Sequence, residues 1–308
     1  MVLDTEFFQF MKTRFNYSEI KDDVARGYAY INLYENFLSK KISPKKAFAA
    51  FLNGILEEKN ELVTNYLSGS VSSLYWSFFN QEQRAGAQQE LEDKVLNLLN
   101  SDISRNLKRT VFGLYRSVAT SLKGKETLYQ LWAKKMKIKD LYISENDFEG
   151  IATQLAIYQH PKAAEVLSEQ LTRISNPDRL KRFKWLLPTL SDDEKVRDDF
   201  MLLLLKKEHR EKESWVQSAL SAIHHPLRQK SGIKHFKSCL DVLEEIQLTG
   251  DIFFPKRWLS SSVGRYSSKE AFGILQRFFK ENPDYNPILK MKLLQTTDNL
   301  SRAQEIRK

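Results

Sequence analysis

Two adjacent histidines in the stretch SAIHHPLRQKSG, residues 221–232, are the first candidates for chemistry in this sequence. Three histidines, His224, His225 and His235, fall within twelve positions, and Arg228 lies just after the pair. Imidazole nitrogens are common metal ligands, and a guanidinium recognises anions such as carboxylates. The stretch could therefore be a metal site, an anion site or simply the start of a helix.

The spacing of these histidines argues against a metal site. Adjacent residues on a helix point about 100° apart, so His224 and His225 cannot both bind one ion from the same face. A thermolysin-type zinc site needs H-E-x-x-H, and no histidine in this chain is followed by glutamate. The G-x-S-x-G, G-x-x-x-x-G-K-[ST] and G-x-G-x-x-G motifs are absent as well. We therefore expect no catalytic residue, no metal ligand and no cofactor in this chain.

Two interpretations of the stretch stay open. In the first, Pro226 starts a helix and His225 caps or packs in the turn before it. In the second, His224, His225 and Arg228 line a groove and meet an anionic group. The single cysteine, Cys239, is expected to be a buried structural residue, because nothing near it in the sequence supplies an oxyanion site.

Composition favours a helical protein with a solvated surface. The 308 residues include only 11 glycines, and the net charge of +9 comes from 48 basic and 39 acidic residues that are interleaved. Interleaved charge is typical of exposed helix faces, so we read Arg105, Lys108 and Arg109 as solvated and expect no nucleic-acid partner. The longest apolar run, FMLLLL at 200–205, is too short to span a membrane, and the start MVLDTEFFQF lacks the features of a signal peptide.

Apolar residues recur every three or four positions along most of the chain, which predicts amphipathic helices. In the second half, helix starts near residues 144, 161, 177, 191 and 213 are about 15 residues apart. Ser144 with Asp147 and Ser191 with Glu194 resemble capping boxes, and Asn176 with Pro177 resembles an N-cap followed by N1. The predicted fold is all-α, an irregular antiparallel helix array similar to HEAT repeats, shaped as a superhelical bowl.

The two halves differ in helix length. We expect a helical bundle over residues 1–140 and an array of helix hairpins over 141–308, packed together as one elongated domain. In the first half, an apolar stripe is predicted to face the core; its members are Ile20, Val24, Tyr28, Ile31, Tyr34 and Leu38. In the second half, Val196, Phe200 and Leu203 are predicted to face inward.

Four segments together resemble a known family. They are VARGYAYINLYENFL, HHPLR, TGDIFFPKRWL and YNPILKMKLLQTTDNLSRA. Their order and spacing resemble the C-terminal helical domain of zinc aminopeptidases of the aminopeptidase N type (gluzincins), particularly Bacteroides-like members. The resemblance covers about residues 17 to 303.

The resemblance implies a non-catalytic domain of a larger enzyme. In that family the zinc ligands and catalytic tyrosine lie in a preceding catalytic domain, and none of those motifs matches a position here. This chain would pack against the catalytic domain of its parent, enclose the peptide cleft and gate peptide access, with His224, His225 and Arg228 lining the chamber. Zinc would belong to the parent's catalytic domain, and Phe7, Phe8 and Phe10 would lie at the edge of that contact. The localisation of the parent is left open.

Two other functions remain open at this point. A stand-alone helical-repeat scaffold would bind protein partners on a concave face. A nucleic-acid binder would use the +9 charge and show steep salt dependence.

Overall fold

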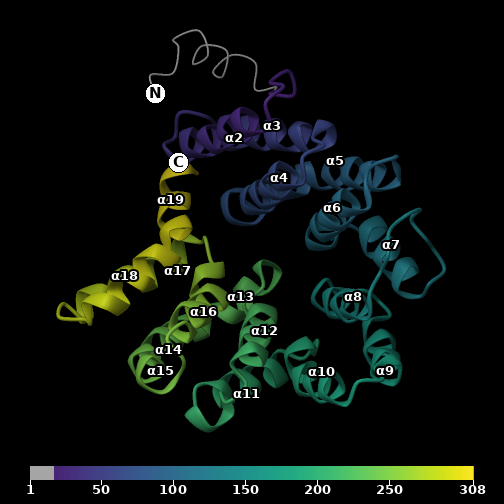
Figure 1. Cartoon of the computed structure of the whole chain (residues 1–308). Helices are drawn as coiled ribbons and strands as arrows, with labels where there is room; N and C mark the ends of the chain where they lie inside the picture. The colour runs from purple at the N-terminus through teal and green to yellow at the C-terminus, as the bar shows by residue number, and fades with distance from the viewer. Residues whose placement is uncertain (1–16, 308) are drawn as a thin grey trace. The chain divides into compact units, whose positions relative to one another are not determined.

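The computed structural model describes residues 17–307, and every regular element in that range is a helix (Figure 1). This confirms the predicted all-α helix array for the described residues. Phe7, Phe8 and Phe10 lie outside them. No described helix combines the length and the apolar character that crossing a bilayer requires.

The chain divides into two compact units between Ile143 and Ser144. The sequence places this boundary at 140/141. Each unit has its own buried apolar residues, and each is described separately below. That the two halves pack together as one elongated domain stays a prediction.

Unit 1 is built from longer helices joined by short connections. Its elements are α2 (Asp23–Leu38), α3 (Pro44–Glu57), α4 (Glu61–Ser73), a π-helical turn η1 (Leu74–Phe78), α5 (Gln81–Asn100), α6 (Arg105–Val118) and α7 (Leu122–Trp132). Helix α4 packs on α3 and α6, and α6 also packs on α5.

Aromatic rings fill the core of unit 1. The rings of Phe37 and Phe78 meet edge to face with their centroids 4.8 Å apart. Tyr30 lies over Gly54, where a Cβ atom would come within 2.4 Å of the tyrosine hydroxyl oxygen, so only glycine leaves room for this ring. Edge-to-face pairs add about 0.5–1.5 kcal/mol each beyond the burial of their area.

The predicted stripe along α2 is wrong for three of its six members, because the helix buries a different side, whereas Ile20, Tyr34 and Leu38 are half-buried. The buried side chains are Arg26, Ala29, Tyr30, Leu33 and Phe37. Val24, Tyr28 and Ile31 are instead exposed, at 81%, 42% and 46%. The guanidinium of Arg26 fixes this orientation, since its Nε and Nη2 donate to the two carboxylate oxygens of Glu58 at 2.6 and 2.7 Å. A bidentate pair of this kind is among the stronger side-chain interactions.

Unit 2 is an array of shorter helices. Its longer elements are α8 (Glu145–Ile157), α9 (Ala163–Arg173), α10 (Pro177–Leu190), α11 (Glu194–Leu204), α12 (Glu213–Ile223), α16 (Phe254–Ser261), α17 (Lys269–Glu281), α18 (Pro287–Thr296) and α19 (Asp298–Ile306). Short elements lie between α12 and α17, namely η3 (Pro226–Arg228), α13 (Gln229–Gly232), η4 (Ile233–His235), α14 (Phe236–Asp241), α15 (Leu243–Thr249) and η5 (Val263–Arg265), with η2 (Lys207–His209) after α11. Helix α8 packs on α9, α10 on α11 and α12, α12 on α16, and α16 on α18.

Polar caps set where the helices of unit 2 begin. Ser144 and Asp147 form the predicted capping box, and the side chain of Asn176 accepts hydrogen bonds at the start of α10. The predicted Ser191–Glu194 box is wrong, because Asp193 is the N-cap of α11. Helix α11 buries Phe200, as predicted, together with Met201 and Leu204, whereas the predicted Val196 and Leu203 are exposed.

Three helices end in the same hydrogen-bond pattern without a glycine. Lys40, Lys134 and Gln159 have φ angles of 64°, 58° and 55°, in the left-handed region. The next residue of each donates its N–H back five positions, as in His160 N to Leu155 O at 2.9 Å. This pattern is a Schellman motif, in which glycine is the usual left-handed residue.

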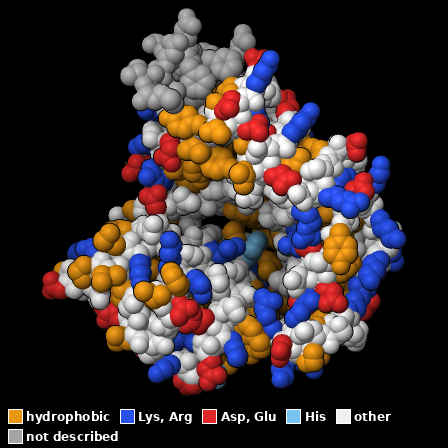
Figure 2. All heavy atoms as spheres, viewed as in Figure 1, with side chains coloured by type: hydrophobic (Ala, Val, Ile, Leu, Met, Phe, Trp, Pro, Cys, Tyr) orange, Lys and Arg blue, Asp and Glu red, His pale blue; other side chains and the backbone are white. Residues whose placement is uncertain are grey.

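Lys108 corrects the expectation of a solvated basic face on α6. Its side chain is buried, and Nζ donates to the carbonyl oxygen of Leu99 at 2.9 Å. Arg105 and Arg109 are exposed. Across the face drawn in Figure 2, Lys and Arg side chains stand among Asp and Glu side chains.

Candidate functional site

The two adjacent histidines have different environments. Helix α12 ends at Ile223, and His224 turns inward as its C-cap with 0% of its surface exposed. His225 is the N-cap of η3, and its Nδ1 accepts a hydrogen bond from the Leu227 backbone N–H at 3.2 Å. The predicted start at Pro226 and the capping role of His225 are therefore confirmed.

His224 takes part in a buried polar network. Its Nδ1 lies 2.7 Å from the Tyr266 hydroxyl, and its Nε2 lies 3.7 Å from Cys239 Sγ. The indole Nε1 of Trp258 donates to the carbonyl oxygen of Cys239 at 2.9 Å. Burial lowers the pKa of His224 to about 3 and raises the pKa of the Cys239 thiol to about 12. A neutral imidazole and a protonated thiol without access to solvent suit a structural role in the core.

Arg228 is also directed into the protein. Its Nη1 donates to the carbonyl oxygens of Thr189 at 2.6 Å and Ala222 at 3.3 Å, which ties η3 to the ends of α10 and α12. Burial lowers the pKa of Arg228 to about 10. Burial, followed by the charges of Arg265 and Arg228, holds the pKa of His225 well below its usual range. That His224, His225 and Arg228 line a substrate chamber stays a prediction.

The third histidine of the sequence cluster has its own partner. His235 Nε2 lies 2.7 Å from Asp198 Oδ1, and this carboxylate also accepts from Lys234. The pKa of Asp198 is lowered by the hydrogen bonds from Lys234 and His235, which outweigh the opposing effect of burial. The three histidines thus bind three different partners. Within residues 17–307, no three His, Cys, Asp or Glu side chains gather in a way that could hold a metal ion.

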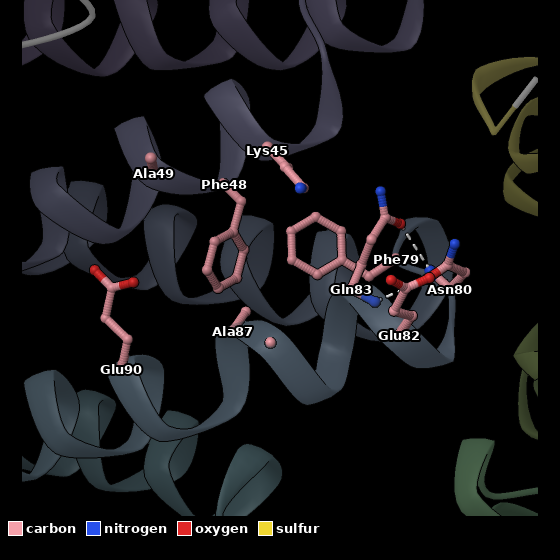
Figure 3. Close-up of a pocket in the computed structure, with 10 residues that line it drawn as sticks. Lys45, Phe48, Ala49, Phe79, Asn80, Glu82, Gln83, Ala87 and Glu90 are labelled. Carbon is pink, nitrogen blue, oxygen red and sulfur yellow. Dashed lines mark hydrogen bonds between the residues drawn. The ribbon is translucent and has the colours of Figure 1, made fainter.

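Unit 1 has a groove that was not predicted from the sequence. It has a volume of about 600 Å³ and lies between α3 and the first half of α5 (Figure 3). Its lining residues are Lys45, Phe48, Ala49, Phe79, Asn80, Glu82, Gln83, Gly86, Ala87 and Glu90. The rings of Phe48 and Phe79 lie 4.8 Å apart and form its apolar floor.

Local structure explains why the groove is open. Residues 81–90 of α5 have no buried side chain, and the run Ala85–Gly86–Ala87 presents no bulk towards α3. The π-helical turn η1 places Phe79, whose N–H donates to Leu74 O at 2.9 Å. Arg84 then donates to the carbonyl oxygen of Phe79 at 2.6 Å. A run of small residues inside a polar helix is the signal that could have indicated the groove from the sequence.

The chemistry of the groove is that of binding. It has an apolar floor, one lysine, Lys45, at one side, and two glutamates, Glu82 and Glu90, at the rim. No nucleophile with an adjacent base lines it. Such a groove suits an apolar side chain of a partner flanked by polar groups.

A second, smaller hollow lies in unit 2. Its volume is about 330 Å³, and it is lined by Ile233, Lys234, Lys237, Glu270, Ile274, Arg277, Phe278 and Glu281. Three cations and two carboxylates share this lining, so it has no strong preference for either sign of charge.

Comparison with known proteins does not assign the chain to a family. No family model matches the chain, and no curated protein matches it.

Proposed function

We propose that this chain is a non-catalytic helical domain of a zinc-dependent aminopeptidase. In this proposal the parent protein removes N-terminal amino acids from peptides, and its catalytic domain holds the zinc. The helical chain encloses the active-site cleft and gates the entry of peptides. The proposal rests on the sequence resemblance, supported by two features of unit 2.

The first feature is that three of the resembling segments meet in one core. His224 from HHPLR contacts Cys239, and Cys239 accepts from Trp258 of GDIFFPKRWL. Helix α16, which carries Trp258, packs on α18, whose Leu289 and Leu293 from the last segment are fully buried. Segments that share one core would be expected to keep their order and spacing in a related domain, and this supports the proposal.

The second feature that supports the proposal is an exposed apolar surface. We call it the docking patch, and it comprises Leu248, Ile252, Phe253, Ile288 and Met291. These side chains are 63–85% exposed. Lys292 Nζ on α18 donates to Gln247 Oε1 on α15 at 2.8 Å. The helix that carries Leu248 and the helix that carries Ile288 and Met291 are therefore neighbours. Hydrophobic side chains gather over the place of α18 in Figure 2.

An apolar surface of this kind usually marks a protein interface. Within the two resembling segments GDIFFPKRWL and YNPILKMKLLQ, some apolar residues build the core while Ile252, Phe253, Ile288 and Met291 face outward. The proposed occupant is the catalytic domain of the parent chain. Docking there would hold the helical array over the peptide cleft.

The test is a comparison of the purified chain with the chain joined to the catalytic portion of its parent. We expect the purified chain to carry less than 0.1 zinc per molecule, by elemental analysis, and to leave aminoacyl anilide substrates intact. The joined protein should hydrolyse them, and removal of the helical chain should change which peptide lengths are cleaved. Stoichiometric zinc in the chain alone, or turnover that survives purification, would refute the non-catalytic role. Unchanged length selectivity would refute gating.

The groove between α3 and α5 favours a second function, a helical scaffold that binds a protein segment. Its floor of Phe48 and Phe79 can accept an apolar side chain. An upstream reading frame that contains H-E-x-x-H would decide for the aminopeptidase.

A further inference from the structure

One arginine in unit 2 has no partner for its charge. Arg265 closes η5 and is only partly exposed. Its backbone is bound, since the carbonyl oxygen accepts from Gln229 Nε2 at 2.8 Å. Its guanidinium, in contrast, forms no hydrogen bond within residues 17–307, and its Nε is buried without an acceptor.

The surroundings of Arg265 supply no negative charge. Burial lowers the pKa of Arg265, and the neighbouring groups that oppose this effect are the phenols of Tyr158 and Tyr266. Burial raises the pKa of Tyr266 well above its usual value, so this phenol stays neutral. The neighbouring histidines are neutral too, because burial and the charge of Arg265 hold the pKa of His224 and of His225 low.

A second cation strengthens the positive field. Arg228 acts on His225 together with Arg265, and its guanidinium donates to the carbonyl oxygens of Thr189 and Ala222. The acid that acts on Arg228 is Asp192, and the neighbouring Arg197 opposes it. His225 thus lies in the field of two guanidinium groups, and its ring packs against Tyr158 with centroids 5.8 Å apart.

A partly desolvated cation without an acceptor is costly. Leaving a buried N–H group of a charged side chain unpaired incurs the full desolvation penalty of that group. The two terminal nitrogens of Arg265 are not fully buried as Nε is, so their N–H groups reach solvent and can donate to a ligand. Two parallel N–H groups of a guanidinium match the two oxygens of a carboxylate or phosphate.

We propose that the Arg265 guanidinium, beside His225 and Tyr158, binds an oxyanion, either a carboxylate or a phosphate. The bound anion would supply both the missing acceptors and the missing negative charge. This site goes beyond the proposed function and does not depend on a catalytic domain, so it can be tested on the chain alone.

The experiment is an NMR titration of the full chain at low salt with three probes. They are trialanine with a free carboxyl terminus, trialanine amide and inorganic phosphate. We expect the free acid, the phosphate or both to bind, and the amide to bind at least tenfold more weakly than the free acid. Binding of the acid alone identifies a carboxylate ligand, and tighter binding of phosphate identifies a phosphate ligand.

Matched variants assign the binding to this side chain. Arg265→Gln should weaken anion binding at least tenfold, and Arg265→Lys should retain part of it. Arg302→Gln, which removes an exposed arginine paired with Asp298, should bind as the unchanged chain does. Because the Arg265 guanidinium has no internal acceptor and is costly to bury, Arg265→Gln should also keep or raise the thermal midpoint. Equal anion affinity in Arg265→Gln and the unchanged chain would overturn the proposal, as would a large loss of stability in that variant.

Discussion

The adjacent side chains of His224 and His225 have different roles, since His224 is fully buried and His225 caps η3. Pro226 after the pair predicts a helix start, and the structure uses His225 as its cap. Nothing local in the sequence indicates that His224 reaches Tyr266, which lies 42 residues away. Arg265 was not a candidate for the same reason, because its lack of a partner depends on distant residues. Spacing excluded a chelating pair but could not assign long-range partners.

His224 makes the stability of the chain depend on pH. Burial holds its pKa at about 3, whereas an imidazole in the unfolded chain titrates near 6.5. The unfolded state therefore binds a proton first as the pH falls. The free energy of unfolding should decrease between about pH 6.5 and pH 3, by up to about 1.4 kcal/mol per pH unit from this group.

The variant His224→Phe tests this assignment. It should lower the free energy of unfolding at pH 7 by about 1–3 kcal/mol, because the Tyr266 hydroxyl loses its partner. It should also flatten the pH dependence, measured by urea denaturation at pH 7, 6, 5 and 4. The control His209→Phe changes an exposed histidine and should keep the slope of the unchanged chain. If His224→Phe keeps that slope too, the assignment fails.

At the scale of helices, periodicity predicted the type of element well and its orientation poorly. Helix α2 carries apolar residues on two sides, and the sequence does not say which side the Arg26–Glu58 pair turns inward. In α11 the run FMLLLL is apolar in every direction, so the buried face is set by packing. Caps were better guides, because Asn176 and Ser144 act within three residues along the chain.

The left-handed end of α8 gives a prediction about stability. Gln159 has a φ of 55°, a conformation that costs a residue with a Cβ about 1–2 kcal/mol. Gln159→Gly removes this cost but makes the unfolded chain more flexible, so the net gain should be about 0.5–1 kcal/mol. The thermal midpoint should rise by about 1–4 °C. Gln159→Ala removes the same side chain but retains a Cβ, so it should give no gain. Equal effects of both variants would contradict the explanation.

At the scale of the whole molecule, the sequence predicted an all-helical chain with a boundary near residue 140. It did not predict which apolar residues would remain at the surface. From the sequence alone, the docking patch residues are indistinguishable from core residues. The packing of α15, α16 and α18 determines that Leu289 and Leu293 are buried whereas Ile288 and Met291 are exposed.

The docking patch predicts which substitutions should weaken contact with the catalytic portion of the proposed parent. Phe253→Lys and Met291→Lys place a charge in an apolar contact and should each weaken association at least tenfold, measured by titration calorimetry. Both side chains are mostly exposed, at 63% and 73%, so the stability of the chain should change by no more than about 0.5 kcal/mol. Leu122→Lys is the control, because Leu122 is 80% exposed on α7 outside the patch. Equal affinity of all three variants would exclude this patch as the interface.

The outward stripe of α2, formed by Val24, Tyr28 and Ile31, affects the colloidal behaviour of the chain. Exposed apolar side chains on one helix face can draw copies of a chain together. Mutual repulsion from the net charge of +9 opposes such contact. That repulsion reaches about 10 Å at 0.1 M salt and about 3 Å at 1 M. Added salt therefore removes the barrier between copies while the attraction between their apolar faces persists.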